Sequence, residues 1–212
     1  MKIQVHAFEP ASRANGPGLR AVVWFQGCTL NCPGCFNPAA HDLHGGVESD
    51  TETLAAEILS PAETIEGVSV SGGEPFQQPE ALLDLLERLA GTRLSQLVFS
   101  GDTLAEITDL PSGPAILRHV DVLIAGRCVA SPRTGHSLIG SANQQIHLLT
   151  GRYRLADLAA VPPREPVLHR DGAVSASGIS PRRPPGRWQF QPRGLPLRPV
   201  VNGRLARWPR TV

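Results

Sequence analysis

Three cysteines fall within eight consecutive residues, at Cys28, Cys32 and Cys35, and this C-x3-C-x2-C spacing constrains the chain more than any other feature. The pattern places three thiolates on one tight loop. Such soft ligands hold zinc or the irons of a 4Fe-4S cluster. Because a ferredoxin-type cluster uses four cysteines, three cysteines would leave one iron free for a ligand other than protein. Chemistry could then take place at that free iron.

A structural zinc site is the alternative interpretation, with His41, His44 or Cys128 as the fourth ligand. Zinc sites usually pair their cysteines in two separate C-x2-C units. Here a single triplet is followed, some 40 residues later, by the run Ser71-Gly72-Gly73-Glu74-Pro75. The two glycines would let the backbone approach a ligand closely, and the glutamate could accept a hydrogen bond from an ammonium group. The two motifs together favour a cluster with a bound cofactor.

The two motifs resemble those of the radical S-adenosylmethionine superfamily. In that superfamily the free iron chelates the amino and carboxylate groups of the cofactor, and the Gly-Gly-Glu-Pro turn contacts the amino group. Softer matches narrow the resemblance to the short activating enzymes of anaerobic ribonucleotide reductase and, more loosely, of pyruvate formate-lyase. These matches cover about residues 1–178 and comprise Asn15 to Arg20, Gln26-Gly27, Phe36-Asn37-Pro38, Gln77 and Gly140 to Gln144.

This resemblance implies which residues hold the cofactors. A 4Fe-4S cluster would be ligated by the three cysteines of the triplet, with S-adenosylmethionine on its free iron. The residues implied for S-adenosylmethionine are Gly72, Gly73 and Glu74, with Phe36, Ser100 and Asn143 as further candidates. Phe36 is included because Gly34 stands where most of the superfamily has an aromatic residue near the adenine. Ser100 and Asn143 could contact the ribose or the carboxylate, but they suit helix caps and turns equally well.

The resemblance also implies an oxidoreductase that cleaves S-adenosylmethionine to a 5′-deoxyadenosyl radical and abstracts hydrogen. The expected result is a glycyl radical on a partner such as anaerobic ribonucleotide reductase, with flavodoxin or ferredoxin as electron donor. For Arg13 and Arg20 it suggests a positive edge facing the partner, and a solvated surface pair is the alternative. Two other functions stay open: a radical enzyme that modifies a peptide or small metabolite, and a non-catalytic metal-binding module with a nucleic-acid-binding tail.

Short β-type runs alternate with helical patterns along residues 1–150, which predicts an α/β fold built from parallel βαβ units. The expected strands are 2–8, 21–25, 67–71, 96–100, 120–125 and 145–149. There are too few units for a closed eight-fold barrel of about 250 residues, so we expect an open, partial (β/α) barrel. The residues that follow expected strands, and that should therefore meet on one rim, are Cys28, Gly72, Ser100, Gly126 and Thr150.

Two helices carry specific signals. The run Ser49-Asp50-Thr51-Glu52 predicts a capping box, with Ser49 as the cap of a helix over 51–59. Pro79 opens a second helix, whose apolar stripe is expected to face the core. The stripe consists of Leu82, Leu85, Leu86 and Leu89. A third, short helix is expected over 104–110.

Composition divides the 212 residues into a main domain, 1–178, and a basic tail, 179–212. The tail has eight arginines, seven prolines and no acidic residue, so its charge is +8, and 12 basic against 19 acidic residues leave the main domain at −7. We expect the tail to be irregular and to contact an acidic partner or the main domain itself, not nucleic acid. The chain has no apolar run long enough to span a membrane, and its cysteines suit a reducing cytoplasm. Cys128 is expected in the core.

Overall fold

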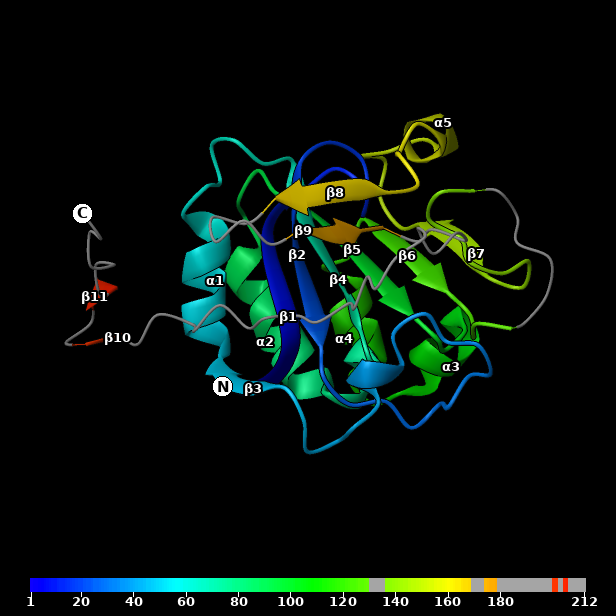
Figure 1. The fold of residues 1–212 in the computed structure, drawn as a ribbon, viewed down its shortest axis with the longest axis horizontal. Coiled ribbons are helices and arrows are strands. Elements are labelled where there is room, and N and C mark those ends of the chain that lie inside the picture. The colour runs from blue at the N-terminus through cyan, green and yellow to red at the C-terminus, as the bar shows by residue number, and fades with distance from the viewer. Residues whose placement is uncertain (130–135, 169–173, 179–199, 202–203, 206–212) are drawn as a thin grey trace.

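The protein is built around one seven-stranded sheet with most of its helices packed against one face (Figure 1). The computed structural model describes residues 1–129, 136–168, 174–178, 200–201 and 204–205. The strands of the sheet are β1 (Lys2–Ser12), β2 (Arg20–Phe25), β3 (Val47–Asp50), β4 (Gly67–Gly72), β5 (Ser95–Ser100), β6 (Val122–Ala125) and β7 (Gln145–Leu148). The α-helices are α1 (Thr51–Leu59), α2 (Pro79–Leu89), α3 (Leu104–Asp109), α4 (Gly113–Leu117) and α5 (Leu155–Ala159). Short 3-10 helices span Pro38–Ala40 and Pro75–Gln77.

The sheet is mixed, in the order β3-β1-β2-β4-β5-β6-β7. The four strands β2, β4, β5 and β6 are parallel to one another, as the sequence predicted. The strands β1, β3 and β7 run antiparallel to their neighbours. The α/β class is therefore confirmed, and the carboxyl ends of the four parallel strands meet at one edge of the sheet.

The direction of β7 corrects one prediction about that edge. Because β7 is antiparallel to β6, the residue that follows it returns to the opposite edge. The Thr150 hydroxyl donates there to Oδ1 of Asp121, the residue before β6, over 2.7 Å. The prediction that Thr150 joins the rim was wrong, and the segment that precedes β7 reaches the rim instead.

The main core lies between the sheet and its helices. The apolar stripe of α2 is fully buried, as predicted, at Leu82, Leu85, Leu86 and Leu89. Each buried leucine contributes about 1.5–3 kcal/mol relative to an exposed one. Alternation along β5 sends Val98 into this core and Leu97 to the other face. On that other face a smaller cluster forms where Leu138 and Leu158 pack against the sheet.

The helix α1 has the predicted bounds but not the predicted cap. Its N-cap is Asp50, whose side chain makes no capping hydrogen bond. Ser49 belongs to β3, where it pairs with Ile3. The prediction was wrong because Ser49 is part of β3, where its hydroxyl donates to the Asp50 carbonyl over 3.5 Å. The start of the helix is tied instead to the chain terminus, whose ammonium donates to the Thr51 hydroxyl over 3.1 Å.

Outside the large sheet the structure describes two short antiparallel pairs. The strands β8 (Glu165–Leu168) and β9 (Val174–Ser177) form one pair, which lies in front of the sheet in Figure 1. In the tail, β10 (Val200–Val201) pairs with β11 (Arg204–Leu205). The other predictions made for the tail fall outside the described residues. No described helix is both long and apolar enough to cross a membrane.

Candidate functional site

The cysteine triplet forms the loop that leaves the carboxyl end of β2. Cys28, Cys32 and Cys35 are all free thiols of intermediate exposure. The loop turns back on itself through Asn31 at φ 47° and Gly34 at φ 76°. Positive φ at position 34 is the conformation that glycine adopts without strain. The loop therefore presents three thiols at the rim of the sheet.

Backbone amides face the sulfur atoms of this loop. The amides of Leu30 and Asn31 donate to the Cys28 sulfur, and the Asn37 amide donates to Cys35 Sγ over 3.4 Å. Burial nevertheless raises the pKa of both thiols, because it disfavours the charged form. The N–H donors oppose this effect of burial, because they stabilise a thiolate or an iron-bound sulfur.

The segment after the triplet fastens the loop to the sheet. The Gly27 amide donates to the Ala40 carbonyl over 2.8 Å, and the Cys28 amide donates to the His41 carbonyl over 3.2 Å. The side-chain amide of Gln26 donates to the Asp42 carbonyl over 2.6 Å. Its oxygen lies 2.7 Å from Nδ1 of His6 on β1. A buried glutamine thus connects the first strand, the second strand and the cysteine loop.

The Gly-Gly-Glu-Pro turn at the end of β4 is bonded directly to the start of the cysteine loop. The Gly73 amide donates to the Phe25 carbonyl over 2.7 Å, and the Glu74 amide donates to the Gly27 carbonyl over 2.9 Å. A Cβ atom on Gly73 would lie 2.1 Å from the Gly27 carbonyl oxygen. Glycine is therefore required here by close approach of two backbones, and the two motifs form one unit.

Glu74 carries a fully buried carboxylate at the centre of the rim. It accepts hydrogen bonds from the Phe76 amide over 3.0 Å, the Ser100 hydroxyl over 2.9 Å and the Gly101 amide over 2.7 Å. Burial raises its pKa to about 7, although these three donors favour the charged form. The carboxyl group joins the ends of β4 and β5 in a dry position beside the cysteine loop.

The raised pKa of Glu74 predicts a pH-dependent stability. The folded state binds a proton between the ordinary pKa of 4.5 and about pH 7, where the unfolded chain does not. Stability contributed by this residue should therefore fall as pH rises from 4.5 to 7 and stay level above. Because each pKa unit is worth about 1.4 kcal/mol, the loss amounts to about 3 kcal/mol.

Chemical unfolding of wild type and the Glu74→Gln variant at pH 5 and pH 8 measures this effect. The variant cannot ionise, so the difference in unfolding free energy between wild type and variant should decrease by about 2.5 kcal/mol from pH 5 to pH 8, the part of the change that falls above pH 5. A difference that is constant across this range would show that Glu74 has an ordinary pKa.

The three further candidates for S-adenosylmethionine binding, Ser100, Asn143 and Phe36, differ in how they are positioned. Ser100 lies at the rim, and its hydroxyl is bonded to Glu74. Asn143, just before β7, donates from its side-chain amide to the Arg127 carbonyl over 2.7 Å. The Phe36 side chain is 51% exposed, next to the third cysteine. The structure thus brings Ser100 and Asn143 to the ends of β5 and β6 and leaves the Phe36 ring accessible on the loop.

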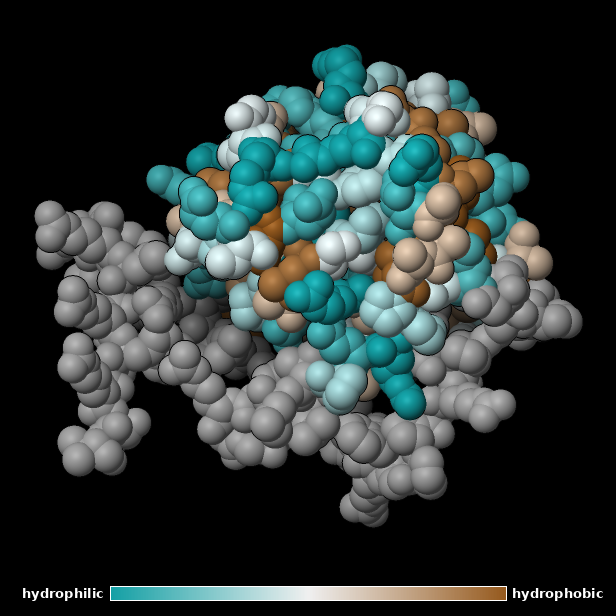
Figure 2. Space-filling view, turned by 90° about the horizontal axis from the view of Figure 1, so that it is seen from above, coloured by the Kyte–Doolittle hydropathy of each residue, from teal (hydrophilic) through white to brown (hydrophobic). Residues whose placement is uncertain are grey.

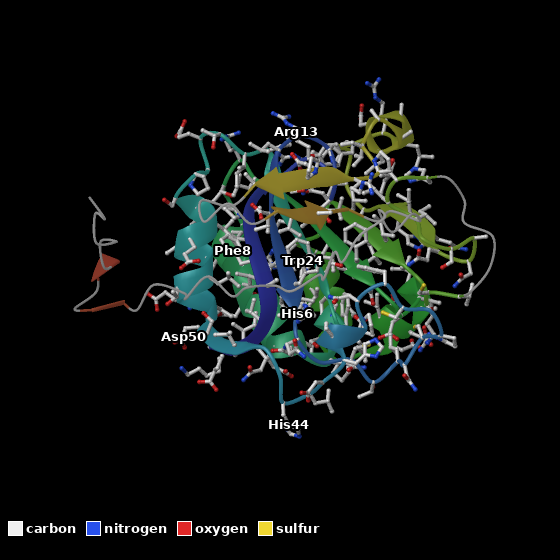
Figure 3. All side chains as sticks on the ribbon, viewed as in Figure 1. His6, Phe8, Arg13, Trp24, His44 and Asp50 are labelled. Carbon is white, nitrogen blue, oxygen red and sulfur yellow. The ribbon has the colours of Figure 1, made fainter. Side chains whose placement is uncertain are left out.

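Neither Arg13 nor Arg20 forms a positive edge beside the cysteine loop. Arg13 lies at the end of the molecule opposite to His44, which follows the triplet (Figure 3). Figure 2 views that opposite end and shows mainly hydrophilic side chains with small apolar patches. Arg20 is fully buried and donates to Ser69 and Ser95, so it organises the amino ends of the strands.

Cys128 lies outside the core, contrary to the prediction. Its side chain has intermediate exposure, and its sulfur is 4.0 Å from the Gly34 carbonyl oxygen. The fold delivers it to the rim because it follows β6 by only three residues. The sequence-based prediction failed because nothing in the local sequence indicates that the loop after β6 turns toward the triplet.

Gln77, which the sequence offered only as one of the softer matches of the resemblance, is bonded to the cysteine loop. Its side-chain oxygen accepts from the Thr29 amide over 3.0 Å, and its amide donates to the Thr29 hydroxyl over 2.7 Å. It therefore holds the residue next to Cys28 from the first turn after the Gly-Gly-Glu-Pro motif. The sequence shows that a glutamine follows the Gly-Gly-Glu-Pro motif. Only the folded structure shows that this glutamine contacts Thr29, 48 positions earlier in the chain.

The donor set fits a 4Fe-4S cluster. Among the described residues, no three His, Cys, Asp or Glu side chains are arranged around a single metal ion. Thiolates of a cluster bind different irons, so they need not converge on one point. The buried side-chain amide of Asn37, two residues after Cys35, has no partner among the described residues and is a further donor in this region. Free thiols, amide donors and a buried acceptor thus occur together.

Comparisons with known proteins agree with this donor set. A family described as "4Fe-4S single cluster domain" matches residues 14–147. The anaerobic ribonucleoside-triphosphate reductase-activating protein of Vibrio cholerae is 32% identical over 155 residues, which are 68% of this chain and 97% of that protein. The pyruvate formate-lyase-activating enzyme of Clostridium pasteurianum is 40% identical over 88 residues, which are 40% of this chain and 37% of that protein.

The similarity to pyruvate formate-lyase-activating enzymes covers only part of them. The enzyme of Listeria monocytogenes is 33% identical over 125 residues, 50% of this chain and 50% of that enzyme. The chain thus spans half or less of these enzymes but nearly the whole reductase-activating protein. These findings confirm an enzyme that uses a 4Fe-4S cluster and S-adenosylmethionine, and they replace the zinc interpretation. The chain belongs to the 4Fe-4S single cluster domain family, among the radical S-adenosylmethionine enzymes of the activating type.

Proposed function

We propose that this protein installs a glycyl radical on a separate large enzyme, an anaerobic ribonucleotide reductase. The observation that carries the proposal is the 32% identity to the activating protein of Vibrio cholerae over 97% of its length. The compact site supports it, because the cysteine triplet and the Gly-Gly-Glu-Pro turn are one hydrogen-bonded unit at an edge of the sheet. A macromolecular partner can approach a site at an edge.

In this proposal Cys28, Cys32 and Cys35 ligate the cluster. When bound, the cluster supplies the single electron that divides S-adenosylmethionine into methionine and a 5′-deoxyadenosyl radical. The amides that face the sulfurs of Cys28 and Cys35 stabilise their charged state.

The cofactor S-adenosylmethionine would be held by the turn and its neighbours. Gly72 and Gly73 keep the turn in close contact with the backbone of Phe25 and Gly27, and Glu74 would supply negative charge for the cofactor's ammonium group. The remaining contacts are assigned to Ser100, Asn143 and Phe36. Because a positive charge beside Glu74 favours its ionised form, cofactor binding would lower the pKa of this carboxyl from about 7.

The wider setting of the reaction follows from the same proposal. The electron would come from a flavodoxin or ferredoxin, and the hydrogen from a glycine in the partner's radical loop. Four free cysteines suit the reducing environment of the cytoplasm, which we propose as the location. The partner and not S-adenosylmethionine decides which radical product accumulates.

The test combines the anaerobically reduced, reconstituted protein with S-adenosylmethionine and the anaerobic ribonucleotide reductase of the same cell. We expect a glycyl radical doublet in the electron paramagnetic resonance spectrum of the reductase. A reductase variant that lacks the radical glycine is the control and should give no doublet. Turnover of S-adenosylmethionine without a doublet would overturn the assignment of this partner while leaving the cofactor chemistry intact.

A further inference from the structure

The fourth cysteine of the chain lies against the cluster loop, although 94 positions separate it from Gly34. The Cys128 sulfur is 4.0 Å from the carbonyl oxygen of Gly34, the residue bonded to Cys35. The Gly34 carbonyl belongs to the peptide bond that links Gly34 to Cys35, so the Cys128 sulfur lies beside the backbone of Cys35.

Hydrogen bonds on both sides hold Cys128 in this position. The preceding carbonyl, of Arg127, accepts from the Asn143 side chain over 2.7 Å and from the Ser141 hydroxyl over 3.5 Å. The following amide, of Val129, donates to the same hydroxyl over 3.2 Å. Ser141 is fully buried, so one fixed hydroxyl bonds to both residues that flank Cys128. These hydrogen bonds therefore fix the backbone on both sides of Cys128 and hold its thiol beside the cysteine loop.

We propose that Cys128 forms a reversible disulfide with Cys35 when an oxidant removes the cluster. The proposal rests on the ligation of the cluster by Cys35 described under Proposed function. It assigns Cys128 no part in the reaction of the intact enzyme. Its role is to protect a ligand cysteine that cluster loss leaves exposed to oxidant.

The chemistry balances with a peroxide as oxidant. The thiolate of Cys35 attacks one peroxide oxygen, the O–O bond breaks, and Cys35 becomes a sulfenic acid while water leaves. The thiolate of Cys128 then attacks the sulfenic sulfur, the S–O bond breaks, and a second water leaves as the S–S bond forms. Two thiols and one hydrogen peroxide thus give one disulfide and two waters. Further oxidation of Cys35 to sulfinic acid, which thiols cannot reverse, is prevented.

The experiment starts from the reconstituted full-length enzyme. Hydrogen peroxide is added until the visible absorbance of the cluster is lost, free thiols are blocked, and peptides are mapped by mass spectrometry without reduction. We expect the main linked peptide pair to contain Cys35 and Cys128. After dithiothreitol and renewed reconstitution, wild type should regain its iron, whereas Cys128→Ser should retain about three-fold more sulfinic acid at Cys35 and regain correspondingly less.

Two further variants distinguish a failure of the disulfide proposal from a failure of the assignment of Cys35 as a cluster ligand. Ser141→Ala keeps all four thiols but removes the hydroxyl that fixes Cys128, so it should reduce the yield of the Cys35–Cys128 pair. The Cys35→Ser variant tests cluster ligation separately from disulfide formation. It should fail to bind a full cluster before any oxidant is added. Disulfides confined to the triplet, with Cys128 still open to alkylation, would overturn the proposal whether or not a glycyl radical forms on the partner.

Discussion

Substitution of Cys32 by serine will abolish the cluster signal of the reduced protein and its cleavage of S-adenosylmethionine. Loss of an outer partner of a metal ligand already costs about 10–100-fold, so loss of a ligand should reduce the cleavage rate by more than about 100-fold. Electron paramagnetic resonance, iron analysis and the yield of 5′-deoxyadenosine measure these effects. Circular dichroism should show an unchanged fold, because Cys32 lies on an exposed loop outside the core clusters.

His44→Ala is the matched control for this variant. His44 follows the same loop and could act as a ligand only if the triplet formed a zinc site. Its backbone amide, which the substitution keeps, donates to Oδ1 of Asp42 over 2.9 Å. The variant should therefore keep full iron content and activity. A Cys32→Ser protein with wild-type iron, or a His44→Ala protein without it, would contradict the ligand assignment.

Alanine at Gly73 will destabilise the protein by about 3 kcal/mol or more, because the overpacked atoms belong to backbone and cannot rotate away. The new Cβ would lie 2.1 Å from the Gly27 carbonyl oxygen and 2.9 Å from the Ala40 carbonyl oxygen. Both carbonyls belong to the segments that frame the cysteine loop. We therefore expect loss of cluster binding together with loss of stability, measured by iron content and by chemical unfolding.

Gly151→Ala provides the control for this effect. A Cβ at Gly151 would meet nothing within 4 Å, and its φ is not in the positive range that disfavours alanine. The free energy of unfolding should change by no more than about 0.5 kcal/mol. Equal effects of the two substitutions would show that the close approach at Gly73 is not needed for folding.

Local patterns were sufficient where a feature depends on neighbouring residues. The bounds of α1 and the buried leucine stripe of α2 follow from helical periodicity, which one face of a helix satisfies without knowledge of the rest. The parallel order of the central strands follows from their alternation with helices.

Local patterns failed where a second element competes for the same residue. Ser49 has the sequence of a helix cap, yet pairing with β1 places it in a strand. Thr150 follows an expected strand, yet an antiparallel β7 carries it to the opposite edge. In both cases strand pairing between distant segments decided the outcome, and no local pattern records that pairing.

The sequence by itself determined the chemical class of the site, because thiolate spacing and the Gly-Gly-Glu-Pro turn are encoded in short contiguous runs. Tertiary structure decided how these runs meet. The backbone contact between Gly73 and Gly27, the burial of Glu74 and the approach of Cys128 to Gly34 all join residues far apart in the chain. Such contacts depend on strand order and direction, which are set by packing of the whole sheet against its helices and not by any single segment.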